Sequence, residues 1–69
     1  MTTSEFLLNK YGARMNIDDL IAELKMPYDT LMQKRSRGTL GLHTYRDGMR
    51  VFAATVDVAE YFDRIRVPG

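Results

Sequence analysis

Apolar residues recur at helical spacing in four parts of the chain, which predicts four helices. The repeats are Phe6, Leu7 and Tyr11; Ile17, Leu20, Ile21 and Leu24; Tyr28, Leu31 and Met32; and Val58, Tyr61, Phe62 and Ile65. The second and fourth repeats follow the i, i+3, i+4, i+7 pattern, so each of these helices should bury one face. The first helix is too short to be stable alone, and packing of Phe6, Leu7 and Tyr11 must hold it.

Capping residues and helix-breaking residues predict where these helices begin and end. The expected N-caps are Thr3 or Ser4, Asn16 and Thr55, and the expected stops are Gly12, Lys25 or Met26, Gly38, and Pro68-Gly69. Proline is tolerated as a first helical residue, so we expect the third helix over about Pro27–Arg37. Only a tight turn then separates the second helix from the third.

Asp47-Gly48 predicts a β-hairpin over Tyr45–Phe52, because both turn residues tolerate the positive φ of a type I′ turn. The pairs predicted around this turn are Tyr45 with Arg50, Arg46 with Met49, and Thr44 with Val51. Two strands alone are marginal in water, so the hairpin must lean on the helices.

Length and composition limit the possible classes of protein. Sixty-nine residues give a single domain, expected over residues 1–69. The chain has no cysteine, which excludes a disulfide framework and a thiolate metal site. No apolar run approaches the roughly 20 residues of a membrane span, and the start of the chain lacks a signal-peptide pattern. We therefore expect a cytoplasmic protein with no membrane partner.

The net charge of +1 conceals two segments of opposite charge. Residues 16–30 contain four acidic residues and one lysine, a net −3, whereas residues 33–50 contain five basic residues and one aspartate, a net +4. The positive clusters belong to the third helix and the hairpin, which are neighbours in a helix-turn-helix followed by a wing. They should form one basic surface that attracts phosphates. The alternative is a solvated surface with scattered charges.

The order helix, tight turn, helix, basic hairpin, helix resembles that of phage and plasmid excisionase-type proteins, which are related to the DNA-binding domain of MerR regulators. The segments that carry the resemblance are residues 16–24, 26–31, 38–40, 50–52 and 55–62. Tyr11-Gly12 and Met15 are similar to a subgroup found in prophages and integrated plasmids. At the position of the loop glycine that commonly precedes the second helix of the motif, this chain has Lys25.

The resemblance implies a mainly α fold with a small β-hairpin, namely a winged helix-turn-helix with a short extra N-terminal helix. It also implies an architectural DNA-binding factor. Such proteins bind repeated sites beside an attachment site, bend the DNA so that an integrase excises the element, and often regulate nearby promoters. The implied partners are double-stranded DNA, further copies of the chain on repeated sites, and an integrase.

Eight residues are expected to contact DNA: Tyr28, Asp29, Gln33, Lys34, Arg35, Arg37, Arg46 and Arg50. The second helix of a helix-turn-helix enters the major groove, where glutamine pairs with adenine and arginine with guanine. Gln33, Lys34 and Arg37 lie on its expected outer side, and the alternative for them is a solvated helix face. Tyr28 contacts a phosphate or a thymine methyl, or else is an aromatic of the core. Asp29 accepts from a cytosine amino group, or else interacts with the helix N-terminus.

Strand alternation places Arg46 and Arg50 on opposite faces of the hairpin. Arg46, beside the turn, is the better candidate for a minor-groove contact, while the other arginine packs or follows phosphates. The alternative for both is an ordinary charged strand edge that discourages aggregation.

The residue content argues against catalysis. His43 is the only histidine, so neither a metal site nor a nucleophile with a neighbouring base is expected. No glycine-rich phosphate loop is present, and we expect no cofactor and no small-molecule substrate. The alternative to a DNA-binding protein is a small protein-interaction module of a phage or plasmid that modulates a host regulator. The low net charge and the acidic Asp29 favour that alternative.

Overall fold

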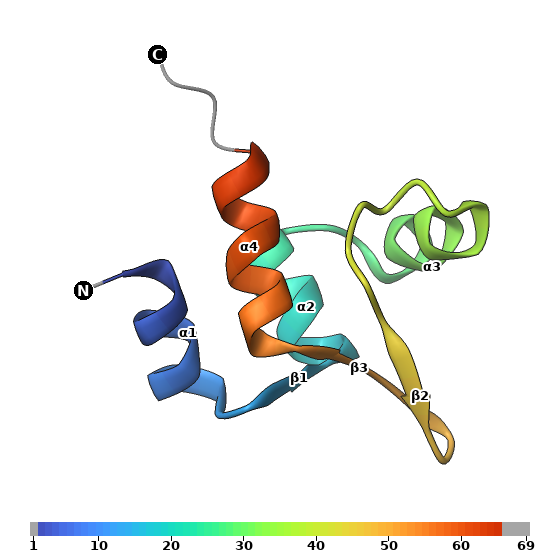
Figure 1. Cartoon of the computed structure of the whole chain (residues 1–69). Helices are drawn as coiled ribbons and strands as arrows, with labels where there is room; N and C mark the ends of the chain where they lie inside the picture. The colour runs from blue at the N-terminus through green and yellow to red at the C-terminus, as the bar shows by residue number, and fades with distance from the viewer. Residues whose placement is uncertain (1, 66–69) are drawn as a thin grey trace.

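Four helices and a three-stranded antiparallel sheet form the part of the chain that the structure, a computed structural model, describes, residues 2–65 (Figure 1). In chain order they are α1 (Thr3–Tyr11), β1 (Arg14–Asn16), α2 (Ile17–Leu24), α3 (Tyr28–Arg37), β2 (Tyr45–Asp47), β3 (Arg50–Ala54) and α4 (Thr55–Ile65). The four predicted helices and the hairpin are present, in a mostly helical α+β fold. The predicted stop at Pro68-Gly69 lies outside the described residues.

The helix starts lie within one position of those predicted. The Asn16 side chain accepts the Asp19 N–H at 2.9 Å, and the Asp19 carboxylate accepts the Asn16 N–H at 3.2 Å, so the predicted cap of α2 is confirmed. The cap of α1 is Thr2 rather than Thr3 or Ser4, because the Thr2 hydroxyl accepts the Glu5 N–H. Pro27 is the N-cap of α3 and not its first residue.

The turn between α2 and α3 depends on a left-handed residue. Lys25 ends α2 with φ 52° and ψ 46°, and it is the only non-glycine residue with positive φ in the described chain. Gly38 ends α3 in the same conformation, with φ 71° and ψ 18°. The two helices of this pair are therefore each closed by a left-handed residue, although only one of them is glycine.

The sheet contains a strand that the sequence pattern did not predict. The strand order is β1-β3-β2, so β3 pairs antiparallel with both neighbours. In the β1–β3 pair, Met15 lies opposite Ala53, and both side chains are fully buried. β1 connects α1 directly to the cap of α2, and it makes the hairpin part of a larger sheet.

The predicted hairpin is present, but its predicted register is wrong. The turn residues are Gly48 and Met49, so Asp47 pairs with Arg50, Arg46 with Val51, and Tyr45 with Phe52. Gly48 has φ +65° and Met49 does not have positive φ, which matches a type II′ turn with glycine first. The register brings the Tyr45 and Phe52 rings to 6.1 Å between centroids. That aromatic pair stabilises the observed pairing, and the predicted register lacks it.

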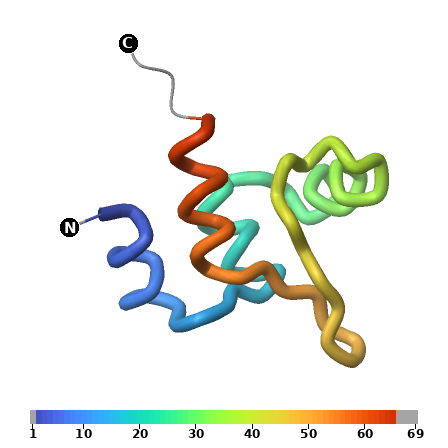
Figure 2. Tube along the Cα trace, in the orientation of Figure 1, coloured from blue at the N-terminus to red at the C-terminus, as the bar shows by residue number. Residues whose placement is uncertain are grey.

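Almost every element contributes to one hydrophobic core. The core residues are Leu7, Met15, Leu20, Leu31, Leu40, Ala53, Val58 and Ala59. Figures 1 and 2 show α1 beside α4 at one end of the molecule, with α3 and the hairpin at the other end. Leu7 fixes α1 to this core, whereas Phe6, which was expected to pack, is 47% exposed. Of the three residues expected to hold α1 in place, Phe6 is therefore the one that lies largely in solvent.

Thr55 does not cap α4, in contrast to the prediction. It is the first residue of the helix, and its hydroxyl donates to the Gly12 carbonyl at 2.6 Å. Its N–H donates to the Ala13 carbonyl at 3.0 Å. Thr55 thus joins the start of α4 to the segment that connects α1 and β1. Among residues 2–65, no helix combines the length and apolar character that crossing a membrane requires.

Candidate functional site

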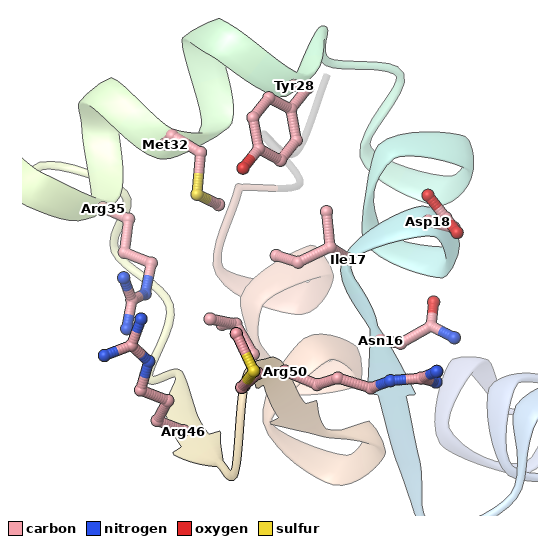
Figure 3. A pocket seen from close by; sticks show the side chains of 10 residues that line it. Asn16, Ile17, Asp18, Tyr28, Met32, Arg35, Arg46 and Arg50 are labelled. Atoms are coloured by element: carbon pink, nitrogen blue, oxygen red, sulfur yellow. The ribbon is translucent and has the colours of Figure 1, made fainter.

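A groove of about 420 Å³ opens between the start of α2, one side of α3 and the β2–β3 hairpin (Figure 3). It is lined by Asn16, Ile17, Asp18, Tyr28, Met32, Arg35, Arg46, Met49, Arg50 and Val51. Apolar side chains make up half of this lining, and three arginines come from the elements on either side. We call this feature the arginine groove.

The α3 wall of the arginine groove is formed by residues spaced one helical turn apart. Tyr28, Met32 and Arg35 lie on this side because Leu31, on the adjacent stripe, is held in the core with 1% of its surface exposed. Tyr28 is 55% exposed, so its interpretation as a core aromatic is wrong. The Arg35 Nε donates to the Thr44 hydroxyl at 2.9 Å, which orients the guanidinium.

The hairpin wall carries the other two arginines. The strand pairing places the Cβ atoms of Arg46 and Arg50 on opposite faces of the hairpin, as predicted. Both side chains nevertheless line the groove. In Figure 3 the side chains of Arg35 and Arg46 approach each other at one end, and Arg50 extends toward Asn16. Three positively charged groups from three elements, α3, β2 and β3, therefore line one hollow.

Asp47, the one acidic residue of the hairpin, does not neutralise these arginines. Its carboxylate accepts from Arg14 Nη1 at 2.8 Å, and the Arg14 guanidinium carbon lies 3.8 Å from the centroid of the Phe52 ring. The hydrogen bond to Asp47 raises the pKa of Arg14. Within residues 2–65, no ion pair involves Arg46 or Arg50. The hairpin therefore presents net positive charge to the groove.

The sequence pattern did not indicate a role for Arg14. Its only signal is a basic residue two positions before the N-cap of α2, which is too common to be informative. The role becomes visible once β1 is known to pair with β3, since this pairing places Arg14 opposite Ala54 and beside the hairpin.

The structure divides the eight predicted contact residues into two sets of four. Tyr28, Arg35, Arg46 and Arg50 meet in the arginine groove. The other four are exposed on α3 and do not line the groove: Asp29, Gln33, Lys34 and Arg37. The outer side predicted for α3 is thus exposed as expected, and it carries the acidic Asp29 next to the basic and amide groups.

A smaller hollow of about 190 Å³ lies beside α4. Its lining consists of Gly41, His43, Asp57, Glu60 and Arg64. Arg64 donates to the Gly41 carbonyl, which holds the loop before β2 against the helix. In the described part of the chain, no group of three or more histidine and acidic side chains could hold a metal ion.

No protein-family model, curated protein or solved structure matches this chain. Its function is therefore inferred from the arginine groove and from the sequence pattern.

Proposed function

We propose that the chain is a sequence-specific DNA-binding protein of the excisionase type, with a winged helix-turn-helix fold. In this proposal α2 and α3 form the helix-turn-helix, α3 enters the major groove, and the β2–β3 hairpin is the wing. The protein promotes excision of an integrated element, regulates nearby promoters, or does both. The order of elements and the position of the hairpin beside α3 support this assignment.

The observation that carries the proposal is the convergence of Arg35, Arg46 and Arg50 on one groove. Guanidinium groups bind phosphate oxygens through paired hydrogen bonds and stay charged at any physiological pH. A sugar–phosphate strand separates the major groove from the minor groove. A protein with a helix in one groove and a hairpin in the other must accommodate that strand between them, where the arginine groove lies.

The remaining lining suits the uncharged part of such a strand. Ile17, Met32 and Val51 offer apolar contacts to deoxyribose, and the hydroxyl of the exposed Tyr28 is a donor for a phosphate oxygen. On the outer side of α3, Gln33 and Arg37 take the base-reading roles, and Lys34 contacts phosphate. Asp29 either accepts from a cytosine amino group or serves the helix N-terminus.

One module of this size covers a small interface, of the order of 600–1,000 Å². Binding by a single copy is therefore weak, and specific occupancy needs repeated sites, contacts between copies, or an integrase bound alongside. This expectation suits an architectural factor that acts on an array of sites in double-stranded DNA.

The test is selection of binding sequences from random double-stranded DNA by the full chain, followed by titration of the selected duplex at several salt concentrations. Wild-type protein should select a defined sequence, and its affinity should fall steeply as salt rises. Arg46→Ala, Arg50→Ala and Arg37→Ala should each weaken binding. Each lost phosphate contact should reduce the slope of log K against log salt by about 0.9.

Arg64→Gln is the matched control, since it removes one positive charge outside the arginine groove and the glutamine amide keeps a donor for the Gly41 carbonyl. It should leave both affinity and salt slope unchanged. The proposal fails if no sequence is selected, or if the three arginine variants behave like Arg64→Gln.

A second candidate is a module that binds a host regulator through an acidic, amphipathic peptide. The half-apolar lining of the arginine groove and the exposed Asp29 on α3 favour it. Failure of the DNA selection, together with capture of one host protein that Arg46→Ala and Arg50→Ala abolish, would establish this second function.

A further inference from the structure

Met49 stands at the apex of the β2–β3 turn with 97% of its surface exposed. The other large apolar side chains exposed in the described chain range from 38% to 55%. Single exposed apolar residues are common, but nearly complete exposure of an unbranched apolar side chain leaves all of it available for a partner.

The turn does not require methionine at this position. A type II′ turn needs glycine at its first central residue, which Gly48 supplies with φ +65°, and it leaves the second position open. Met49 is also absent from the core and from the partly buried residues packed against it. Neither local geometry nor stability therefore accounts for an apolar residue at the apex.

The surroundings of Met49 indicate the chemistry of a partner. Asp47 and Arg50 flank the turn, Arg46 precedes Asp47, and Met49 lines the arginine groove with Arg46 and Arg50. An apolar tip that shares a groove with two guanidinium groups fits a surface whose rim is anionic and whose interior is apolar. The minor groove of DNA is such a surface, since phosphates border it and stacked bases form its floor.

We propose that Met49 inserts between two base pairs from the minor-groove side and kinks the DNA toward the major groove. This inference rests on the proposed DNA-binding function. Architectural proteins use methionine and other apolar side chains as wedges of this kind, and the flexible thioether chain adapts to the gap between bases. The step beneath the turn should be pyrimidine–purine, because these steps unstack most readily.

The test uses the full chain and the duplex obtained by selection, with two measurements. Energy transfer between dyes at the duplex ends reports the bend, and 2-aminopurine placed at each adenine in turn reports unstacking of a step. Wild-type protein should bend the duplex and raise 2-aminopurine fluorescence at one step. Met49→Ala and Met49→Gln should reduce both signals and weaken binding about tenfold, whereas Met49→Leu should retain them.

Val56→Ala is the matched control, because Val56 is a half-exposed apolar residue on α4, away from the hairpin. It should change neither signal. Bending and unstacking that persist unchanged in Met49→Ala and Met49→Gln would overturn the role of Met49 while leaving DNA binding intact. Absence of any duplex binding by the wild-type chain would overturn both the proposed function and this inference.

Discussion

Thr55 is the one fully buried polar residue in the described chain, and its hydroxyl has a single partner, the Gly12 carbonyl. Thr55 is buried whereas Gly12 is exposed, so the Gly12 carbonyl can bind water when the hydroxyl is removed, and the expected loss is that of an ordinary hydrogen bond. At the scale of one residue, this bond joins the first residue of α4 to the C-cap of α1.

Thr55→Val removes the hydroxyl and keeps the side-chain volume, so it should lower the free energy of unfolding by about 0.5–1.5 kcal/mol. Urea denaturation followed by circular dichroism measures this difference. Thr30→Val is the matched control, since Thr30 lies in α3 with no side-chain hydrogen bond among those found in residues 2–65. It should change the free energy by less than about 0.5 kcal/mol. Equal effects at the two positions would show that the Gly12 bond contributes nothing.

At the scale of elements, the turn from α2 to α3 carries a conformational cost at Lys25. A lysine in the left-handed region has its Cβ close to the following carbonyl, at a cost of about 1–2 kcal/mol. Glycine avoids this cost but loses more entropy on folding.

Lys25→Gly should therefore make the protein more stable than Lys25→Ala by about 0.5–1 kcal/mol. Both variants remove the charge and the long side chain, so their difference isolates the Cβ in the left-handed conformation. Chemical denaturation of the two variants side by side gives the comparison. An alanine variant as stable as the glycine variant would mean that the turn relaxes out of this conformation.

The elements differ in how far their sequence could predict them. α2 and α4 were predicted because each has a long apolar stripe, and α2 also begins at the cap residue that the sequence indicated. β1 was missed because Arg14–Asn16 has one apolar residue, and its partner strand lies almost 40 positions further along. The hairpin was predicted from Asp47-Gly48, but the choice between type I′ and type II′ depends on which pairs form. The Tyr45–Phe52 contact, which no local pattern specifies, accompanies the observed choice.

At the scale of the whole molecule, the arginine groove could also be predicted only in part from the sequence. The basic residues of α3 and the hairpin were identified from their charge, but charge alone could not say which of them meet. Leu31 sets the rotation of α3, and this rotation sends Arg35 into the groove and leaves Arg37 outside it. The pairing of Asp47 with Arg14 then keeps the hairpin positive, and it depends on a strand that was not predicted.

A contact between α1 and α2 holds α1 in place and makes the stability of the fold depend on pH. Glu23 of α2 accepts hydrogen bonds from Lys10 Nζ, at 2.7 Å, and from the Tyr11 hydroxyl. These bonds, that from Lys10 first, hold the pKa of Glu23 below its ordinary value of 4.5. A carboxyl whose pKa is lower in the folded state contributes stability at pH values above its unfolded pKa. This contribution is lost as the pH falls through the folded pKa.

Glu23→Gln should therefore destabilise the protein by about 1 kcal/mol at pH 7, and the difference from wild type should shrink as the pH falls below 4.5. Tyr11→Phe, which removes one donor and keeps the ring, should be less destabilised than Glu23→Gln and should show part of the same pH dependence. Free energies of unfolding measured from pH 7 to pH 3 test both variants. If wild type and Glu23→Gln lost stability in parallel over this pH range, Glu23 would not hold α1 against α2.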